Sequence, residues 1–155
     1  MKTGVECLSL LVLGVLASAN CLAQNITVRL VDVRNGQVLA NETVSVQFHV
    51  PQVSALQSLE GKTGNDGVAK FRLPEPVPKE IAALTTNERL YPCYSRLPQE
   101  TQTLVQEGRV SRCSKQGCRC KFSKQVWQIQ SKPGELVLLV RPFTGWEKFL
   151  SHVWE

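Results

Sequence analysis

The sequence has few of the side chains on which acid–base and metal catalysis depend. Its 155 residues include two aspartates, Asp32 and Asp66, and two histidines, His49 and His152. It contains no Gly-x-Ser-x-Gly elbow, no His-Glu-x-x-His pair and no glycine-rich phosphate loop. Alternation places His49 on the outer face of a strand, and Asp66 lies in a turn whose backbone amides its carboxylate can cap. We therefore predict that the protein is not an enzyme and needs no cofactor.

Long hydrophobic runs are also scarce, and the one present lies near the N-terminus. The apolar run Cys7–Ala19 has 13 residues, against the roughly 20 needed to cross a bilayer. Small residues follow it, as in a signal peptide cleaved after Ala19 or Ala23. Cleavage after Ala23 leaves an even number of cysteines, so we predict a signal peptide over residues 1–23 and a periplasmic or secreted protein. An uncleaved anchor and a lipid on Cys21 are the alternatives.

The chain that follows this signal has the size of one domain. It keeps 132 residues and a net charge of +5, and the whole sequence is 43% apolar, which argues against intrinsic disorder. The longest apolar run that it still contains, Leu136–Val140, has five residues. We therefore predict no transmembrane span in the mature chain.

Apolar and polar side chains alternate in several short segments, which is typical of β-strands buried on one face. The period-two pattern extends over 25–30, 43–50 and 69–73. Turn sequences separate these segments, at Asn35-Gly36 and across 63–67. The pattern predicts an antiparallel sandwich or barrel.

The second half of the chain is less regular. The segment Glu135–Arg141 is almost continuously apolar, which is typical of a strand buried on both faces. We expect it to share a core with the first strand, and 81–130 to be partly an excursion. This excursion is predicted to hold a helix over Gln99–Glu107, capped by Gly108, and a short strand over Val126–Ile129.

Two stretches of the sequence carry a family resemblance. Gly36–Val46 matches Gly-x-x-Leu-x-x-x-x-Val-x-Val, and Thr63–Phe71 matches Thr-x-x-x-Gly-x-Ala-x-Phe. The chain therefore resembles the carboxypeptidase regulatory-like domain, a transthyretin-like member of the immunoglobulin-like and carbohydrate-binding-like sandwiches. The resemblance implies a non-catalytic binding or scaffold module of the bacterial cell envelope. We predict one such domain over 24–141, followed by a tail over 142–155. A cysteine-rich basic insert at about 93–124 departs from the compact pattern of the family.

Four cysteines, Cys93, Cys113, Cys118 and Cys120, follow the predicted signal. A bond between Cys118 and Cys120 would enclose a single residue and strain the disulfide geometry. Two pairings are left: Cys93 with Cys118 and Cys113 with Cys120, or Cys93 with Cys120 and Cys113 with Cys118. We predict structural disulfides and no metal, because spacings of four and one are not those of paired zinc knuckles. A four-cysteine zinc site is the alternative.

Positive charge is concentrated around these cysteines. The stretch 109–124 holds six basic and no acidic side chains, which exceeds the net charge of +5. We therefore predict that an anionic glycan, an envelope protein or a lipid headgroup binds here, and that nucleic acid does not, because an exported chain without a nucleic-acid motif would not meet it. The candidate ligand-binding residues are Arg109, Arg112, Lys115, Arg119, Lys121 and Lys124.

The C-terminal residues have helical periodicity. Apolar side chains recur at i, i+3, i+4, i+7 and i+8, which predicts a short amphipathic helix. So short a helix is marginal in isolation and needs a surface to cover, either its own domain, a second subunit or a membrane. The candidate interface residues are Trp146, Phe149, Leu150, Val153 and Trp154.

Together these observations predict an exported, non-enzymatic, envelope-associated binding or assembly module whose target the sequence does not identify. The first alternative is a structural protein that forms homo-oligomers through the aromatic tail. The second alternative is a small four-cysteine metal-binding protein.

Overall fold

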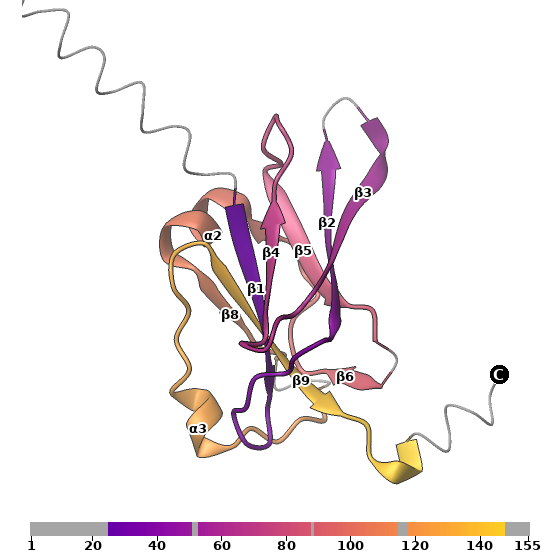
Figure 1. Ribbon diagram of the computed structural model, residues 1–155. Helices are drawn as coiled ribbons and strands as arrows, with labels where there is room; N and C mark the ends of the chain where they lie inside the picture. Colours follow the sequence, from indigo (N-terminus) through magenta and orange to yellow (C-terminus); the bar gives the residue numbers. More distant parts are fainter. Residues whose placement is uncertain (1–24, 51–52, 88, 115–117, 148–155) are drawn as a thin grey trace, which may run out of the picture.

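The computed structural model describes residues 25–50, 53–87, 89–114 and 118–147. Within these residues the chain forms nine strands and two helices. The strands are arranged in two sheets, one of five strands and one of four (Figure 1). The predicted signal peptide and the tail beyond Glu147 lie outside the described residues.

The five-stranded sheet has β1 and β9 at its centre. β9 runs parallel to β1 and to β8, whereas the β1–β4 and β6–β9 pairs are antiparallel. The prediction of a wholly antiparallel fold was therefore wrong. Parallel strands need a long connection, which the residues between β1 and β9 supply, and alternation does not report strand direction. The strands are β4 (Val68–Arg72), β1 (Asn25–Asp32), β9 (Glu135–Pro142), β6 (Leu90–Pro92) and β8 (Arg109–Ser111).

The four-stranded sheet is antiparallel throughout. Its order is β3 (Val53–Lys62), β2 (Thr43–Val50), β5 (Glu80–Thr85) and β7 (Gln99–Glu100). Because β5 lies between β2 and β7, and Ile81 is fully buried, the prediction that an excursion starts at about Ile81 was wrong. This part of the chain is a central strand of the second sheet.

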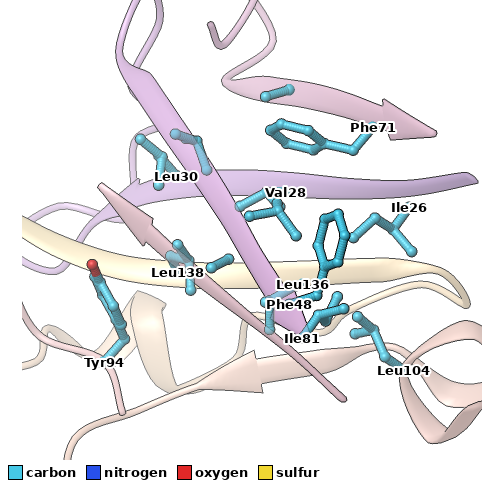
Figure 2. Close-up of a cluster of buried hydrophobic side chains, with 14 of the residues drawn as sticks. Ile26, Val28, Leu30, Phe48, Phe71, Ile81, Tyr94, Leu104, Leu136 and Leu138 are labelled. Carbon is cyan, nitrogen blue, oxygen red and sulfur yellow. The ribbon is translucent and has the colours of Figure 1, made fainter. Parts of the chain in front are cut away.

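One apolar cluster contains side chains from both sheets (Figure 2). The alternation in the first two predicted strands is confirmed, since Ile26, Val28 and Leu30 are each at most 1% exposed and Val44 and Val46 are fully buried. Burial of these side chains is the main favourable term in folding. The other buried members of the cluster are Phe48, Ala69, Phe71, Leu73, Ile81, Ala83, Leu90, Tyr94, Leu104, Leu136, Leu138 and Val140.

A second apolar cluster lies on the outer face of the five-stranded sheet. β9 contributes Val137 and Leu139 to it, while Leu136, Leu138 and Val140 face the first cluster. The prediction of a last strand buried on both faces is therefore confirmed. Val126 and Cys93 belong to the outer cluster, and Phe122 packs against it.

The helix predicted over Gln99–Glu107 is confirmed from Thr101 onward, whereas its first two residues form β7. α2 spans Thr101–Glu107, and the backbone N–H of Gly108 donates to the carbonyl of Leu104 at 2.8 Å. Gly108 has a φ of +71°, and a Cβ there would lie 1.9 Å from the carbonyl oxygen of Lys132. Only glycine fits this position without a rearrangement.

The second helix replaces a predicted strand. α3 spans Lys124–Trp127, so the prediction of a strand over Val126–Ile129 was wrong. Val126 is fully buried, but the neighbouring Trp127 is 57% exposed. One buried anchor in so short a segment gives no reliable periodicity, and packing on the outer cluster decides the conformation. Among the described residues, no helix has the length and apolarity needed to cross a membrane.

Candidate functional site: an arginine groove beside two cysteine pairs

β6 and β8 lie end to end along one edge of β9 and approach each other. β6 pairs with Val140–Pro142 and β8 with Leu136–Leu138, so both strands end opposite Leu139. The backbone N–H of Cys93, just after β6, donates to the carbonyl of Leu139 at 2.9 Å. The N–H of Cys113, just after β8, donates to the carbonyl of Cys93 at 3.1 Å. The sheet itself therefore brings these two cysteines together.

The structure selects one of the two cysteine pairings that the sequence leaves open. Cys93 and Cys120 are paired at disulfide distance, with Cα atoms 5.8 Å apart, and Cys113 and Cys118 with Cα atoms 5.7 Å apart. The Sγ atoms of Cys113, Cys118 and Cys120 also lie within 4.8 Å of one another. The two pairs therefore form a single cluster of sulfur atoms, and they connect the basic stretch to the end of β6.

The basic stretch is fixed on the outer face of the five-stranded sheet. The N–H of Ser123 donates to the carbonyl of Val33 at 2.9 Å, and Phe122 packs against the outer cluster. The ring of Phe122 meets that of Trp127 edge-on, with centroids 5.4 Å apart. The described residues after Cys118 are therefore held against the folded sheet.

An open groove of about 590 Å³ runs beside the cysteine pairs. Three arginines line it, Arg96, Arg109 and Arg112, and none of its described lining residues is acidic. Its other described lining residues are Tyr91, Pro92, Tyr94, Ser95, Leu97, Cys113, Ser114 and Cys118. We call this feature the arginine groove.

Arg112 is the arginine most firmly held in the groove. Its guanidinium lies over the ring of Trp127, 5.2 Å from the centroid, and its Nη2 donates to the carbonyl of Val126 at 3.4 Å. Its buried Nε has no hydrogen-bond partner within the described part of the chain. Arg96 and Arg109 are exposed, and neither forms an ion pair with a described residue. The groove therefore presents three uncompensated positive charges.

Two other cavities share lining residues with the groove. Both are lined by Arg109 and Arg112, with volumes of about 310 and about 540 Å³. Each also contains an acidic side chain, Glu100 in the first and Glu107 in the second. Carboxylates therefore border the positive centre, and anion binding is favoured in the arginine groove itself.

The structure divides the predicted ligand-binding residues into two groups. Arg109 and Arg112 line the arginine groove, whereas Arg119, Lys121 and Lys124 are exposed and line none of these three cavities. Lys115 lies outside the described residues. Arg96 was missed because it is an isolated charge 13 positions before the basic stretch. Only the convergence of β6 and β8 brings it near the other two arginines.

The predicted interface residues are described only in part. Trp146 is 69% exposed, while Phe149, Leu150, Val153 and Trp154 lie outside the described residues. Beside Trp146, both carboxylate oxygens of Glu147 accept hydrogen bonds from Arg141 at 2.7 Å. The Arg141 guanidinium, followed by the N–H of Thr144, lowers the pKa of Glu147 to about 2. This ion pair fixes the start of the tail.

The environments of Asp66 and His49 agree with the structural roles predicted for them. Asp66 accepts a hydrogen bond from the N–H of Val68 at 3.1 Å, as expected of a turn aspartate, and His49 is exposed on the outer side of β2.

Comparison of the chain with protein-family models, with curated proteins and with solved structures finds no match. What the chain does must therefore be argued from the arginine groove and the sulfur cluster.

Proposed function

We propose that this protein is an exported, non-enzymatic binding module of the cell envelope that takes an anionic ligand in the arginine groove. The observation that carries the proposal is the lining of the groove, which has three arginines and no carboxylate among the described residues. Guanidinium groups pair with carboxylate, sulfate and phosphate through two parallel hydrogen bonds. The groove therefore suits a ligand with closely spaced anionic groups.

The position of Arg112 adds to the case for binding. Its stacking on Trp127 reduces the rotational freedom that a free arginine would lose when it holds a ligand. A net charge of +5 would also draw an anionic ligand toward the protein.

The proposed fold and location are consistent with this function. We propose that the two sheets form a β-sandwich of the carboxypeptidase regulatory-like type, which is supported by the core that they share. Two cysteine pairs at disulfide distance suit an oxidising compartment such as the periplasm or the cell exterior. Among the candidate ligands we favour an acidic glycan, because Trp127, which is 57% exposed and lies outside the groove lining, could stack on a sugar that extends past Arg112.

The proposal is tested by capture on immobilised polygalacturonate, a carboxylate-bearing polysaccharide, across a series of salt concentrations. Changing Arg109 or Arg112 to Gln should weaken capture by about tenfold or more each, the worth of a lost charged hydrogen bond. The matched control is Lys121→Gln with Lys124→Gln, which removes charge from the same stretch but outside the groove. It should reduce capture by no more than a few-fold.

The melting temperature of each variant separates lost binding from lost folding. If capture falls equally in the groove variants and in the matched control, binding follows net charge alone and the groove is not the site. If the unaltered protein captures neither polygalacturonate nor dextran sulfate at low salt, the proposal of an anion-binding module is wrong.

A further inference from the structure

The sulfur cluster combines cysteines from three separate parts of the chain. Cys93 follows β6, Cys113 follows β8, and Cys118 and Cys120 belong to the segment that leads to α3. Three of the sulfur atoms lie within 4.8 Å of one another, and the fourth, that of Cys93, is paired with Cys120. The sequence spacing argues against a zinc site, but it does not show that the fold adds Cys93 to the other three.

The spacing of these sulfur atoms is close to what a zinc ion requires. Zinc binds thiolates at about 2.3 Å in a tetrahedron, so the sulfur atoms of a four-cysteine site lie about 3.8 Å apart. Once both S–S bonds are opened, the sulfur atoms of Cys113, Cys118 and Cys120 need to move toward or away from one another by roughly 1–2 Å. Cys93 would join them from its pairing with Cys120, whose Cα atom lies 5.8 Å from its own. Rotation of the cysteine side chains can supply such a change while the backbone N–H of Cys93 stays hydrogen-bonded to Leu139 of β9.

The local charge also suits a zinc–thiolate centre. Four thiolates around one divalent ion carry a net charge of about −2. Arg112, Arg119 and Lys121 are direct sequence neighbours of the cysteines, and the stretch 109–124 contains no acidic residue. These cations would stabilise the negative centre. An all-sulfur donor set favours zinc over magnesium or calcium, which prefer oxygen ligands.

We propose that the four cysteines form a redox-dependent zinc site, with two disulfides in the oxidised protein and one bound zinc ion in the reduced protein. Two molecules of a dithiol reductant each deliver two electrons and two protons, so that both disulfides become four thiols and the dithiols become disulfides. Zinc then binds as the four thiols release their protons. This proposal goes beyond the anion-binding function, although Cys113 and Cys118 also line the arginine groove.

A bound zinc ion would link the same four cysteines that the two disulfides link, and would hold the same segments together. Cys113 and Cys118 line the arginine groove, and Cys93 belongs to the outer cluster. A zinc ion that joins all four cysteines would keep the basic stretch attached to the end of β6 after reduction. The shape of the arginine groove would then persist in both redox states, while the negative zinc–thiolate centre in its lining would weaken its attraction for anions.

The test uses the full mature chain, reduced with a phosphine reductant without oxygen and titrated with cobalt(II) and then with zinc(II). We expect one cobalt ion per chain, with the absorption of a tetrahedral, sulfur-bound ion, and its stoichiometric displacement by zinc. The melting temperature of the reduced protein should rise by about 5 °C or more with zinc. The oxidised protein should bind neither metal.

Variants identify the ligands. Cys113→Ser should weaken cobalt binding by about 100-fold or more, because losing a direct ligand should cost at least as much as losing an outer-shell partner. Cys93→Ser should do the same if the residue after β6 supplies the fourth ligand. The matched control, Lys124→Gln, should bind as the unaltered chain does. The proposal is overturned if the reduced chain binds less than one ion, if Cys93→Ser binds as tightly as the unaltered chain, or if metal binds without raising the melting temperature.

Discussion

Contacts of Arg141 with Glu147 and with Tyr91 fix the position of the start of the tail. Glu147 accepts two hydrogen bonds from Arg141, and the guanidinium of Arg141 in turn lies over the ring of Tyr91, 4.9 Å from its centroid. Tyr91 is in the edge strand β6 and lines the arginine groove. The start of the tail is therefore connected to the groove by side chains alone, in a way that no sequence pattern indicates.

This ion pair predicts a specific dependence of stability on pH. The pKa of Glu147 falls from an ordinary value of 4.5 to about 2 in the folded protein. A carboxyl group with a lowered pKa stabilises the fold above its unfolded pKa and loses that contribution as the pH falls, here between 4.5 and about 2. Because the side chain of Glu147 is 34% exposed, we expect less than about 1 kcal/mol.

The measurement compares the unaltered protein with Glu147→Gln by denaturant unfolding at several pH values. The stability difference between them should be present at pH 7, shrink below about pH 4.5 and vanish near pH 2. Titration of the Glu147 carboxyl group by NMR gives its pKa directly. A midpoint close to 4.5 would show that the Arg141 contact does not persist in solution.

Whether an element could be predicted depends on how much of its burial is regular along the sequence. β2 buries Val44, Val46 and Phe48 on one face, and β9 buries both faces, so both leave a clear pattern. β3 pairs with β2 at the edge of its sheet, and the side chains described from Ala55 to Ser58 are all exposed. No alternation marks such a strand, because hydrogen bonds to its neighbour hold it in place.

The end of α2 offers a test at this scale. Gly108→Ala would place a Cβ against the backbone of Lys132 and would force a left-handed φ on alanine. We expect a loss of about 2 kcal/mol or more in the free energy of unfolding, measured with urea. The matched control is Gly145→Ala, where a Cβ would meet nothing within 4 Å, and its stability should change by no more than about 0.5 kcal/mol. Equal effects of the two changes would show that the Lys132 contact does not hold α2 in place.

At the scale of the whole molecule, the sequence predicted the composition of the candidate site better than its shape. The concentration of charge at 109–124 identified Arg109 and Arg112, and the strain of a Cys118–Cys120 bond reduced the cysteine pairings to two. The choice between those pairings, and the addition of Arg96, depend on two strands meeting opposite Leu139. Contacts between segments that are far apart in the chain leave no recognisable pattern in the local sequence.

The proposed export of the protein can be tested by intact mass spectrometry of the chain expressed with its predicted signal peptide. We expect a chain that begins at Gln24, carries no lipid and gains about 4 Da on reduction, one hydrogen for each of the four cysteines. A lipid on Cys21 would make the protein a membrane-anchored lipoprotein instead. A mass unchanged by reductant would contradict the two disulfides and would mean that the cysteines leave the cell as thiols.

The same sample, sprayed from native buffer, tests whether the molecule assembles. If the exposed Trp146 and the predicted aromatic face of the tail cover their own domain, the native mass is that of one chain. If they cover a second copy, the native mass doubles, and Trp146→Ser with Trp154→Ser returns it to one chain. A dimer that survives both substitutions would exclude the tail as the interface and would direct attention to β3, an edge strand of the second sheet with unpaired backbone groups on one side.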